Sequence, residues 1–512
     1  MKRTWNIVSI GTLVLLFLFS LQGTASTATK DTLIYVMGAE IVSLDPPNQT
    51  DSLSMTAIQH IYDLPIHKDS KGTLIPALFT KWEHSNNGKT WTFHLRKGVK
   101  FHDGTPFNAE AVKFVWERNT SAKKKVRRRS YFTPWAQNIK VIDEHTIQTT
   151  SKKPFAPLLR FFTHGSMAIP SPTALKKYGD QINRNPVGTG PFRFVKWIPG
   201  DRLVLERNED FWGPKPKFKN LIIRFVKESG ARVMMLETGE ADLILKVPPV
   251  DIERLRKNPD IDVLVKPSNR VIGFYVNTSA PLVNDRRFRQ ALAYAIDKEA
   301  IVKHVMKGVA QPHCSVIGGG TFGEAKVKCY EYNVEKAKQL LKETGYKGEK
   351  LRLWTPKGRY TMDMETAEAV QGYWQQAGIK VEFRVMEFPT LTRGVRKVNS
   401  KYQVVLLGAG PTTLDGDQIM RARYHSGQIP PNGVNLSRYN NPEYDKCAED
   451  QSIELDVEKR KEIMKKGQEI LARDLPYIPL YVLKQVVGVR KHVKGVEQLQ
   501  TEMTIVREAY LE

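Results

Sequence analysis

The spacing of apolar residues along the chain changes near residue 220. Before that point, apolar and polar residues alternate in short stretches, as in Trp91, Phe93 and Leu95. Alternation with a period of two is typical of strands that bury one face of a sheet. Two such stretches within 189–212 flank the turn sequence Pro199-Gly200-Asp201, which predicts a hairpin. The first part of the chain is therefore predicted to be rich in strands.

After residue 220, helical and strand-like patterns alternate. Helices are predicted at 230–239, 285–308, 333–345, 365–378 and 459–474, and strands at 222–226, 379–385, 402–408 and 478–482. Asn333 and Gly345 stand where a helix is expected to begin and to end. The whole pattern predicts a mixed α/β protein. A chain of 512 residues is long enough for two or more domains.

The first 28 residues have the pattern of an export signal. Lys2 and Arg3 precede an apolar run from 7 to 21, and small residues follow at 23–28. A charged start, a short apolar run and small residues are typical of a secretory signal peptide. Cleavage after Ala25 and cleavage after Ala28 both fit, and an uncleaved membrane anchor is the alternative. We expect a periplasmic, soluble mature protein.

The formal net charge is +24, and removal of Lys2 and Arg3 lowers it to +22. Such an excess favours an anionic ligand, an acidic partner or a membrane surface. The densest basic run, 123–129, is either a solvated surface or the binding surface of an adhesin or a chaperone-like module. Nucleic acid is not expected, because the run lacks the aromatic and groove-reading context that nucleic-acid binding needs.

Three cysteines remain in the mature chain. Cys314 and Cys329 enclose a short, glycine-rich segment, and in an oxidising compartment we expect them to form a disulfide that leaves Cys447 free. Three buried, reduced thiols are the alternative.

Motifs for catalysis are missing from the sequence. His102 and Asp103 supply the residue types of acid–base catalysis, but neighbours on a strand face opposite sides, and Asp-Gly followed by Thr-Pro favours a turn. A phosphate-binding loop at Gly88-Lys89-Thr90 needs a glycine where Glu83 stands. The motifs G-x-S-x-G, H-E-x-x-H and C-x-x-C do not occur. We therefore expect no enzyme, no catalytic residues, no metal and no cofactor; an exported peptidase or esterase is the alternative, since catalytic triads are spatial.

The segment TLIPALFTKWEHSNNGKTWTFHLRKGVKFHDGTPFNAEAVKFVWER, residues 73–118, resembles the signature region of the family 5 extracellular solute-binding proteins of ABC importers. The resemblance continues through VGTGPFRFVKW, LETGEADLI, NDRRFRQALAYAIDKEAIV, EKAKQLLKETGY and RYNNPEYDKCAED, and so covers nearly all of the mature chain. In that family the His-Asp pair lies in a structural turn.

The resemblance implies a two-lobed α/β periplasmic binding protein with an extra subdomain and a ligand cleft between the lobes. The expected division is a signal peptide at 1–28, lobe 1 at 29–60, 187–270 and 478–512, the extra subdomain at 61–186 and lobe 2 at 271–477. The implied function is peptide or glutathione-like transport. We expect the protein to capture a small-molecule ligand, close on it and deliver it, as a monomer, to ABC permease subunits in the inner membrane.

Two segments are expected to line the cleft. In peptide-binding relatives the second crossing strand leads into a G-W-x-x-D-x-x-x-D-P stretch, and here 407–427 corresponds to it. Ala409 replaces the tryptophan and Thr412 the first aspartate, which puts a plain peptide in doubt and is more similar to the glutathione-binding branch. The expected ligand-binding residues are Phe274, Tyr275 and Asn277 on the first crossing strand and Ala409, Gly410, Thr412, Thr413, Asp415 and Asp417 in the second segment. Asp415 and Asp417 either meet a ligand ammonium or are turn and helix-cap carboxylates. Dipeptide, oligopeptide, glutathione and opine ligands stay open.

Overall fold

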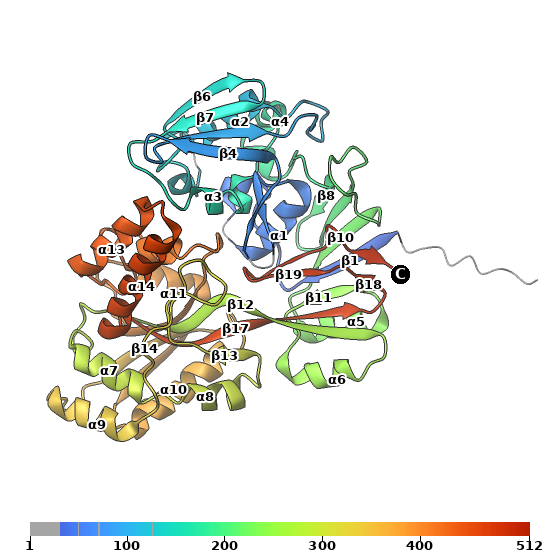
Figure 1. Cartoon of the computed structure of the whole chain (residues 1–512). Coiled ribbons are helices and arrows are strands. Elements are labelled where there is room, and N and C mark those ends of the chain that lie inside the picture. Colours follow the sequence, from blue (N-terminus) through green and yellow to red (C-terminus); the bar gives the residue numbers. More distant parts are fainter. Residues whose placement is uncertain (1–30, 50, 70–71, 125) are drawn as a thin grey trace, which may run out of the picture.

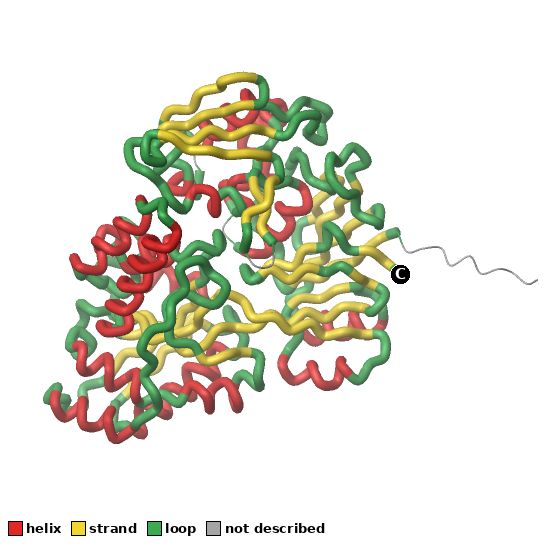
Figure 2. Tube along the Cα trace, in the orientation of Figure 1, coloured by secondary structure: helices red, strands yellow, loops and turns green. Residues whose placement is uncertain are grey.

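The computed structural model describes residues 31–49, 51–69, 72–124 and 126–512, so the predicted signal peptide lies outside the described residues. A twisted sheet of eleven strands runs through two lobes, and a smaller four-stranded sheet lies beside the first lobe (Figure 1). Helices lie against the large sheet and on one side of the smaller one (Figure 2). This arrangement confirms the mixed α/β, two-lobed fold.

The large sheet has the order β15-β14-β16-β12-β17-β11-β1-β10-β9-β8, with β13 paired to β17. Its strands are β1 (Thr32–Met37), β8 (Phe192–Ile198), β9 (Arg202–Arg207), β10 (Asn220–Phe225), β11 (Leu243–Leu245), β12 (Ile261–Val276), β13 (Ala310–Pro312), β14 (Leu351–Pro356), β15 (Val381–Met386), β16 (Val404–Ala409) and β17 (Tyr477–Arg490). The predicted hairpin is β8–β9, with Gly200 at φ 76° in its turn.

Two long strands, β12 and β17, join the lobes. Residues 261–267 of β12 pair with 484–490 of β17 beside lobe 1, and 271–275 pair with 477–482 in lobe 2. The register shifts between Pro267 and Val271, so pairing is interrupted where the strands pass from one lobe to the other. The second crossing strand is therefore β17. We expected it to lead into 407–427, but the strand before that segment, β16, pairs with β12 and β14 within lobe 2.

The smaller sheet belongs to the segment predicted as the extra subdomain. Its order is β4-β5-β7-β6, formed by Phe79–Ser85, Thr90–Leu95, Thr146–Thr150 and Asn138–Asp143. Helix α2 (Ala109–Thr120) begins where the Asn108 side chain accepts a hydrogen bond from the Ala111 N–H. The helix buries Trp116 against Phe79, Phe93 and Phe162. A core of aromatic rings, packed mostly edge to face, holds this subdomain together.

His102 and Asp103 lie in a structural turn. Both ring nitrogens of His102 meet backbone groups, with Nε2 3.0 Å from the Gly190 carbonyl and Nδ1 3.4 Å from the Gly188 N–H. Asp103 accepts hydrogen bonds from the hydroxyls of Ser171 and Thr105. The pair ties the subdomain to the start of β8.

Most predicted helices form, with one break. The remaining helices are α1 (Ser52–Ile61), α3 (Leu158–Phe161), α4 (Pro172–Tyr178), α5 (Ser229–Thr238), α6 (Ile252–Arg256), α7 (Arg286–Tyr294), α8 (Lys298–Ala300), α9 (Val334–Glu343), α10 (Asp363–Gln376), α11 (Phe388–Val395), α12 (Asp417–Ile419), α13 (Pro442–Ile453) and α14 (Val457–Asp474). The single helix expected at 285–308 is wrong: it stops after Tyr294, and Asp297 caps a new start by accepting from the Ala300 N–H at 2.8 Å.

Short strands complete lobe 1 and its border with the subdomain. They are β2 (Ile66–Lys68), β3 (Leu74–Pro76), β18 (Val493–Lys494), β19 (Glu497–Leu499), β20 (Met503–Ile505) and β21 (Tyr510–Leu511). Within the described parts of the chain, no helix is both long and apolar enough for a membrane span.

Candidate ligand site between the lobes

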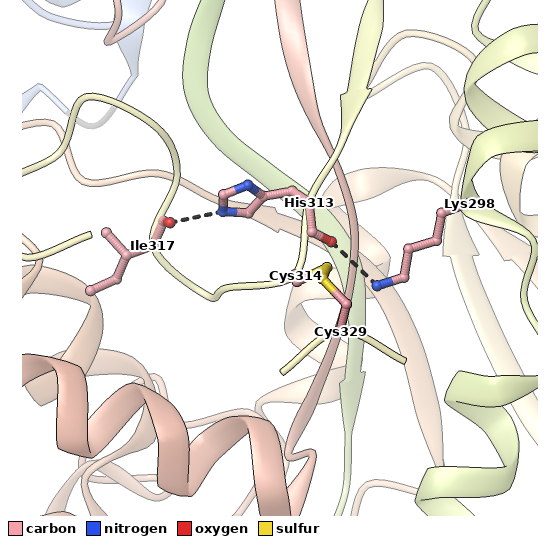
Figure 3. The surroundings of a disulfide bond; sticks show 5 residues. All are labelled: Lys298, His313, Cys314, Ile317 and Cys329. Carbon is pink, nitrogen blue, oxygen red and sulfur yellow. Dashed lines mark hydrogen bonds between the residues drawn. A yellow bond between two sulfur atoms is a disulfide. The ribbon is translucent and has the colours of Figure 1, made fainter. Parts of the chain in front are cut away.

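The disulfide predicted as one of two alternatives is present in the structure and supports a loop beside β12. Cys314 and Cys329 are bonded, and Cys447 is buried and free (Figure 3). Figure 3 also shows the His313 ring turned toward the Ile317 carbonyl, 2.9 Å from it. A Cβ on Gly318 would lie 2.2 Å from the Asn269 carbonyl oxygen, so only glycine fits there. The bridged loop therefore packs directly against the crossing strand.

The predicted residues of β12 point to the interior of lobe 2. The Phe274 ring packs on Trp374 of α10 at 5.2 Å, while Tyr275 packs on Tyr477 at 4.7 Å. Both rings are fully buried, and the Asn277 side chain donates to the Tyr402 carbonyl. These contacts are those of packed core residues.

The segment after β16 lies beside the interruption in β12. Ala409 pairs with Val271 and is buried. Gly410 allows the chain to pass close to Asn269, whose side-chain amide donates to the Pro411 carbonyl at 2.6 Å. The Thr412 N–H donates to Gln418, and Thr413 is buried and accepts from the Asp415 N–H. Gly410 and Thr412 are the partly exposed members of this set.

Asp415 and Asp417 are fully buried and have arginine partners. Arg460 donates to both carboxylate oxygens of Asp415, at 2.7 and 2.9 Å. Arg421 does the same for Asp417, at 2.6 and 2.8 Å, and holds the pKa of that carboxyl below its usual range against the opposing effect of burial. This is the geometry of structural ion pairs. It favours the alternative in which Asp415 and Asp417 are structural carboxylates of a turn and a helix cap. A ligand contact by either carboxylate stays a prediction.

The subdomain contacts lobe 2 directly beside these pairs. Arg160 of α3 lies 4.0 Å from an oxygen of Asp415, and its guanidinium and that of Arg460 lie 4.7 and 4.8 Å from the Phe322 ring centre. The Ala156 N–H donates to the Ser452 carbonyl at 2.9 Å. The two halves of the molecule are therefore in contact at the mouth of the cleft.

The basic run reaches the same region. Arg128 donates to the Gln49 carbonyl and to the Tyr131 hydroxyl, at 2.9 and 2.6 Å. The Tyr131 hydroxyl in turn accepts a hydrogen bond from Gln418 of lobe 2. At least this arginine of the run belongs to the border between the lobes.

A small pocket lies between the lobes over β17. We call it the cleft pocket; its volume is about 80 Å³, and it is lined by Ser52, Leu53, Leu245, Lys246, Val247, Val309, Arg359, Tyr360, Thr361, residues 483–487 and Glu502. Pockets that hold small molecules usually measure roughly 300 to 1,000 Å³. The lobes in this structure are therefore closely apposed, and a ligand needs them to separate in order to enter.

Cations outnumber anions at the cleft pocket. Arg270 donates to Glu502 at 2.8 Å, with 15% and 22% of the two side chains exposed. Burial raises the pKa of Glu502, but Arg270, Lys246 and Arg359 together bring it below its usual value. Three cationic side chains thus surround one carboxylate, and an anionic ligand would complete the charge balance.

A fourth cation stands nearby without a carboxylate. Arg423 is half-buried, and the neighbouring Tyr275 hydroxyl is the chief cause that raises its pKa, with a smaller effect of Tyr360. Tyr360 also lines the cleft pocket. Among the described residues, no aspartate or glutamate forms an ion pair with Arg423. Such a guanidinium is suited to bind a carboxylate in two-point geometry.

We call Lys246, Arg270, Arg359, Arg423 and Glu502 the cationic cluster. None of its members was expected to line the cleft, because no motif marks them: Arg270 lies within β12, Arg423 lies in a helical turn at Met420–Tyr424, and the other three lie outside the helices and strands. The one usable signal was the large positive net charge. In the described part of the chain, no group of acidic, histidine and cysteine residues is arranged to hold a metal ion.

Comparison with known proteins agrees with this architecture. The family model described as bacterial extracellular solute-binding proteins, family 5 Middle, matches residues 73–431. The glutathione-binding protein GsiB of Shigella flexneri is 30% identical over 481 residues, which cover 93% of each chain. GsiB of Escherichia coli K12 is 29% identical with the same coverage.

Solved structures share the whole fold. The periplasmic binding protein DppA from Helicobacter pylori, in complex with peptide STSA, superposes with a TM-score of 0.82 at 28% identity, covering 94% of this chain and 98% of that chain. AgaA of A. tumefaciens R10, in complex with agropinic acid, superposes with a TM-score of 0.79 at 25% identity, covering 94% of this chain and 99% of that chain.

The resemblance seen in the sequence is thereby confirmed, and the alternative of an exported hydrolase finds no support among these binding proteins. With two lobes around a cleft, a family match over most of its length and relatives aligned almost from end to end, the chain belongs to the bacterial extracellular solute-binding proteins of family 5, the substrate-binding components of ABC importers.

Proposed function

We propose that this chain is an exported, periplasmic and monomeric binding protein that captures a small, net-anionic peptide-like solute and delivers it to an ABC permease without chemical change. The cationic cluster carries the proposal. A ligand with two carboxylates and one ammonium, such as glutathione, matches three cations around one carboxylate better than a neutral or cationic peptide does. The name of the GsiB relatives supports the same ligand class.

Closure gives this site its selectivity. Lys246 and Glu502 belong to lobe 1 and Arg359 to lobe 2, so a solute between them contacts both lobes. A ligand that binds the closed arrangement better than the open one shifts the population toward closure, and the permease then meets the closed form. Of the two lobe boundaries proposed from the sequence, 270/271 lies at the interruption in β12 and serves as the hinge in this scheme, whereas 477/478 lies at the lobe 2 end of β17.

Some residues predicted from the sequence remain candidates for direct contact. Gly410 and Thr412 are partly exposed beside the crossing strand, where backbone and hydroxyl groups are able to hydrogen-bond a peptide-like ligand. The Thr412 hydroxyl already contacts Gln418, at 3.4 Å. We therefore propose that this threonine contributes neutral hydrogen bonds, and that the charge recognition lies with the cationic cluster.

The test is a ligand comparison on the purified mature protein. Calorimetry with glutathione, a neutral dipeptide and a dilysine peptide is expected to rank glutathione first and dilysine last. Arg359→Gln and Arg423→Gln should each weaken glutathione binding by about 2 to 5 kcal/mol. Arg393→Gln, which removes an exposed arginine of α11, is the control and should change little.

Two outcomes refute the proposal. One is equal affinity for the glutathione and dilysine ligands; the other is unchanged affinity in both cluster variants. Mass spectrometry of the bound ligand after prolonged incubation tests the absence of catalysis, because an enzyme would return a cleaved product. Cell fractionation with N-terminal sequencing tests export and distinguishes cleavage after Ala25 from cleavage after Ala28.

A further inference from the structure

A second, larger cavity lies on the lobe 1 side of the subdomain. Its volume is about 480 Å³, and it shares no lining residue with the cleft pocket. We call it the side cavity; it is lined by Gln59, Leu64, His67, Lys68, Asp69, Ile75, Thr163, residues 211–214, Gly495, Glu497, Leu499, Ile505, Arg507 and Glu508. Its size is within the range of roughly 300 to 1,000 Å³ that small-molecule sites occupy.

Two hydrogen-bond donors at this cavity are buried without a partner. The Lys68 ammonium nitrogen is buried from solvent and has no hydrogen-bond partner within the described chain. The same holds for the Trp212 indole nitrogen. A buried donor left unpaired typically costs about 1 to 3 kcal/mol, and more when the group is charged. Native structures rarely keep two such donors at one cavity unless a ligand or solvent meets them.

The charges around Lys68 do not neutralise it. Asp63, behind the cavity, is already held by His67 at 2.6 Å and by Arg507 at 3.1 Å. Burial and, to a smaller extent, Arg160 lower the pKa of Lys68 to about 8, with Glu497 opposing both. At neutral pH the ammonium is therefore charged and lacks a fixed counter-charge.

The rest of the lining selects the kind of anion. Leu64, Ile75, Phe211, Leu499 and Ile505 give the cavity an apolar surface. Asp69, Glu497 and Glu508 also line it, and these carboxylates repel a ligand with two or more negative charges more strongly than a monoanion. The chemistry fits a monoanion with an apolar body better than it fits phosphate.

We propose that the side cavity binds a small organic monocarboxylate, with its carboxylate at Lys68 and its apolar part against Phe211, Leu499 and Ile505, and with Trp212 as a second donor. This site is separate from the cleft pocket and does not depend on the proposed transport ligand. Arg160, whose charge acts on Lys68, also contacts Asp415 of lobe 2. A single residue therefore links the side cavity to the contact between the lobes.

Hexanoate is the probe, and 1-hexanol, which has the same apolar chain without the charge, is its neutral counterpart. Calorimetry or ligand-detected NMR at millimolar concentrations should show that wild-type protein binds hexanoate more tightly than hexanol. Lys68→Met should weaken hexanoate binding about tenfold or more, which corresponds to about 1.4 kcal/mol. Lys68→Arg should retain most of the affinity. Lys303→Met removes an exposed lysine of lobe 2 and is expected to behave as the wild type.

A competition experiment shows whether the side cavity binds hexanoate independently of the transported ligand. Hexanoate should bind equally well with and without saturating glutathione, and Lys68→Met should bind glutathione as the wild type does. Equal affinity for hexanoate and hexanol overturns the proposal, as does unchanged hexanoate affinity in Lys68→Met. Displacement of hexanoate by glutathione would also overturn it, because the side cavity would then hold part of the transported ligand.

Discussion

Asp415→Asn separates the two roles that this carboxylate can have. As a ligand anchor, Asp415 would contribute to affinity and little to stability. As the partner of Arg460, it would contribute to stability above all. The substitution keeps the shape and one oxygen acceptor of the side chain but removes the charge.

The structure gives the magnitude. Asp415 is fully buried and only 5% of the Arg460 side chain is exposed, so solvent hardly screens the pair. Breaking a buried ion pair by removing one partner costs about 3 to 5 kcal/mol. Because asparagine retains one neutral hydrogen bond, the expected loss of stability lies at the lower end of this range, at about 3 kcal/mol. Arg160, 4.0 Å away and 24% exposed, adds less than about 1 kcal/mol.

The assay combines urea unfolding with ligand calorimetry on the same preparations. Asp415→Asn should lower the free energy of unfolding by about 3 kcal/mol and leave the affinity of the folded protein within about threefold of wild type. A double-mutant cycle with Arg460→Met should show strong coupling between the two substitutions. An affinity loss of about 2 kcal/mol or more with wild-type stability would refute this reasoning and restore Asp415 as the ligand anchor.

Three further predictions concern stability. Serine at both Cys314 and Cys329 should lower the free energy of unfolding by about 3 kcal/mol, measured in urea, because the bridge closes a loop of 15 residues; equal stability would contradict this. Gly318→Ala should cost about 1 to 3 kcal/mol through its clash with the crossing strand, whereas Gly319→Ala, whose nearest neighbours lie at 3.8 Å or more, should be tolerated. Burial lowers the pKa of His60 from 6.5 to about 4, so the unfolded chain takes up its proton first and stability falls as pH drops from about 6.5 to 4, by roughly 3 kcal/mol. Flat stability across that range would contradict the assignment of a neutral His60.

The periodic elements were predictable because their patterns are local. Alternating residues around Trp91 and Phe93 and around the Pro199-Gly200 turn mark strands that each bury one face, and the structure has them as β5 and β8–β9. The helix at 285–308 was the exception. Its apolar spacing continues past Tyr294, but Asp297 offers a backbone hydrogen bond that competes with the helix and restarts it.

The residues proposed for binding were far less predictable. Phe274 and Tyr275 stand on the correct crossing strand, yet a strand reveals only that its side chains alternate, not which face is covered by helices. In the structure one ring meets α10 and the other meets Tyr477, so both faces are buried. Lys246 and Glu502 come together only because the end of β11 meets the start of β20, and no spacing in the sequence indicates this contact.

In the proposed function, closure and ligand charge are linked at the cationic cluster. Bringing the lobes together brings Arg359 toward Lys246 and Arg270, and the single carboxylate of Glu502 offsets only part of their mutual repulsion. An anionic ligand removes the remainder, so its charge stabilises the closed state more than the open one, which is the condition for a ligand to drive closure. A neutral isostere of the same size would fill the cleft without removing this repulsion. The cationic cluster therefore links the selection of the solute to the conformation in which it is delivered.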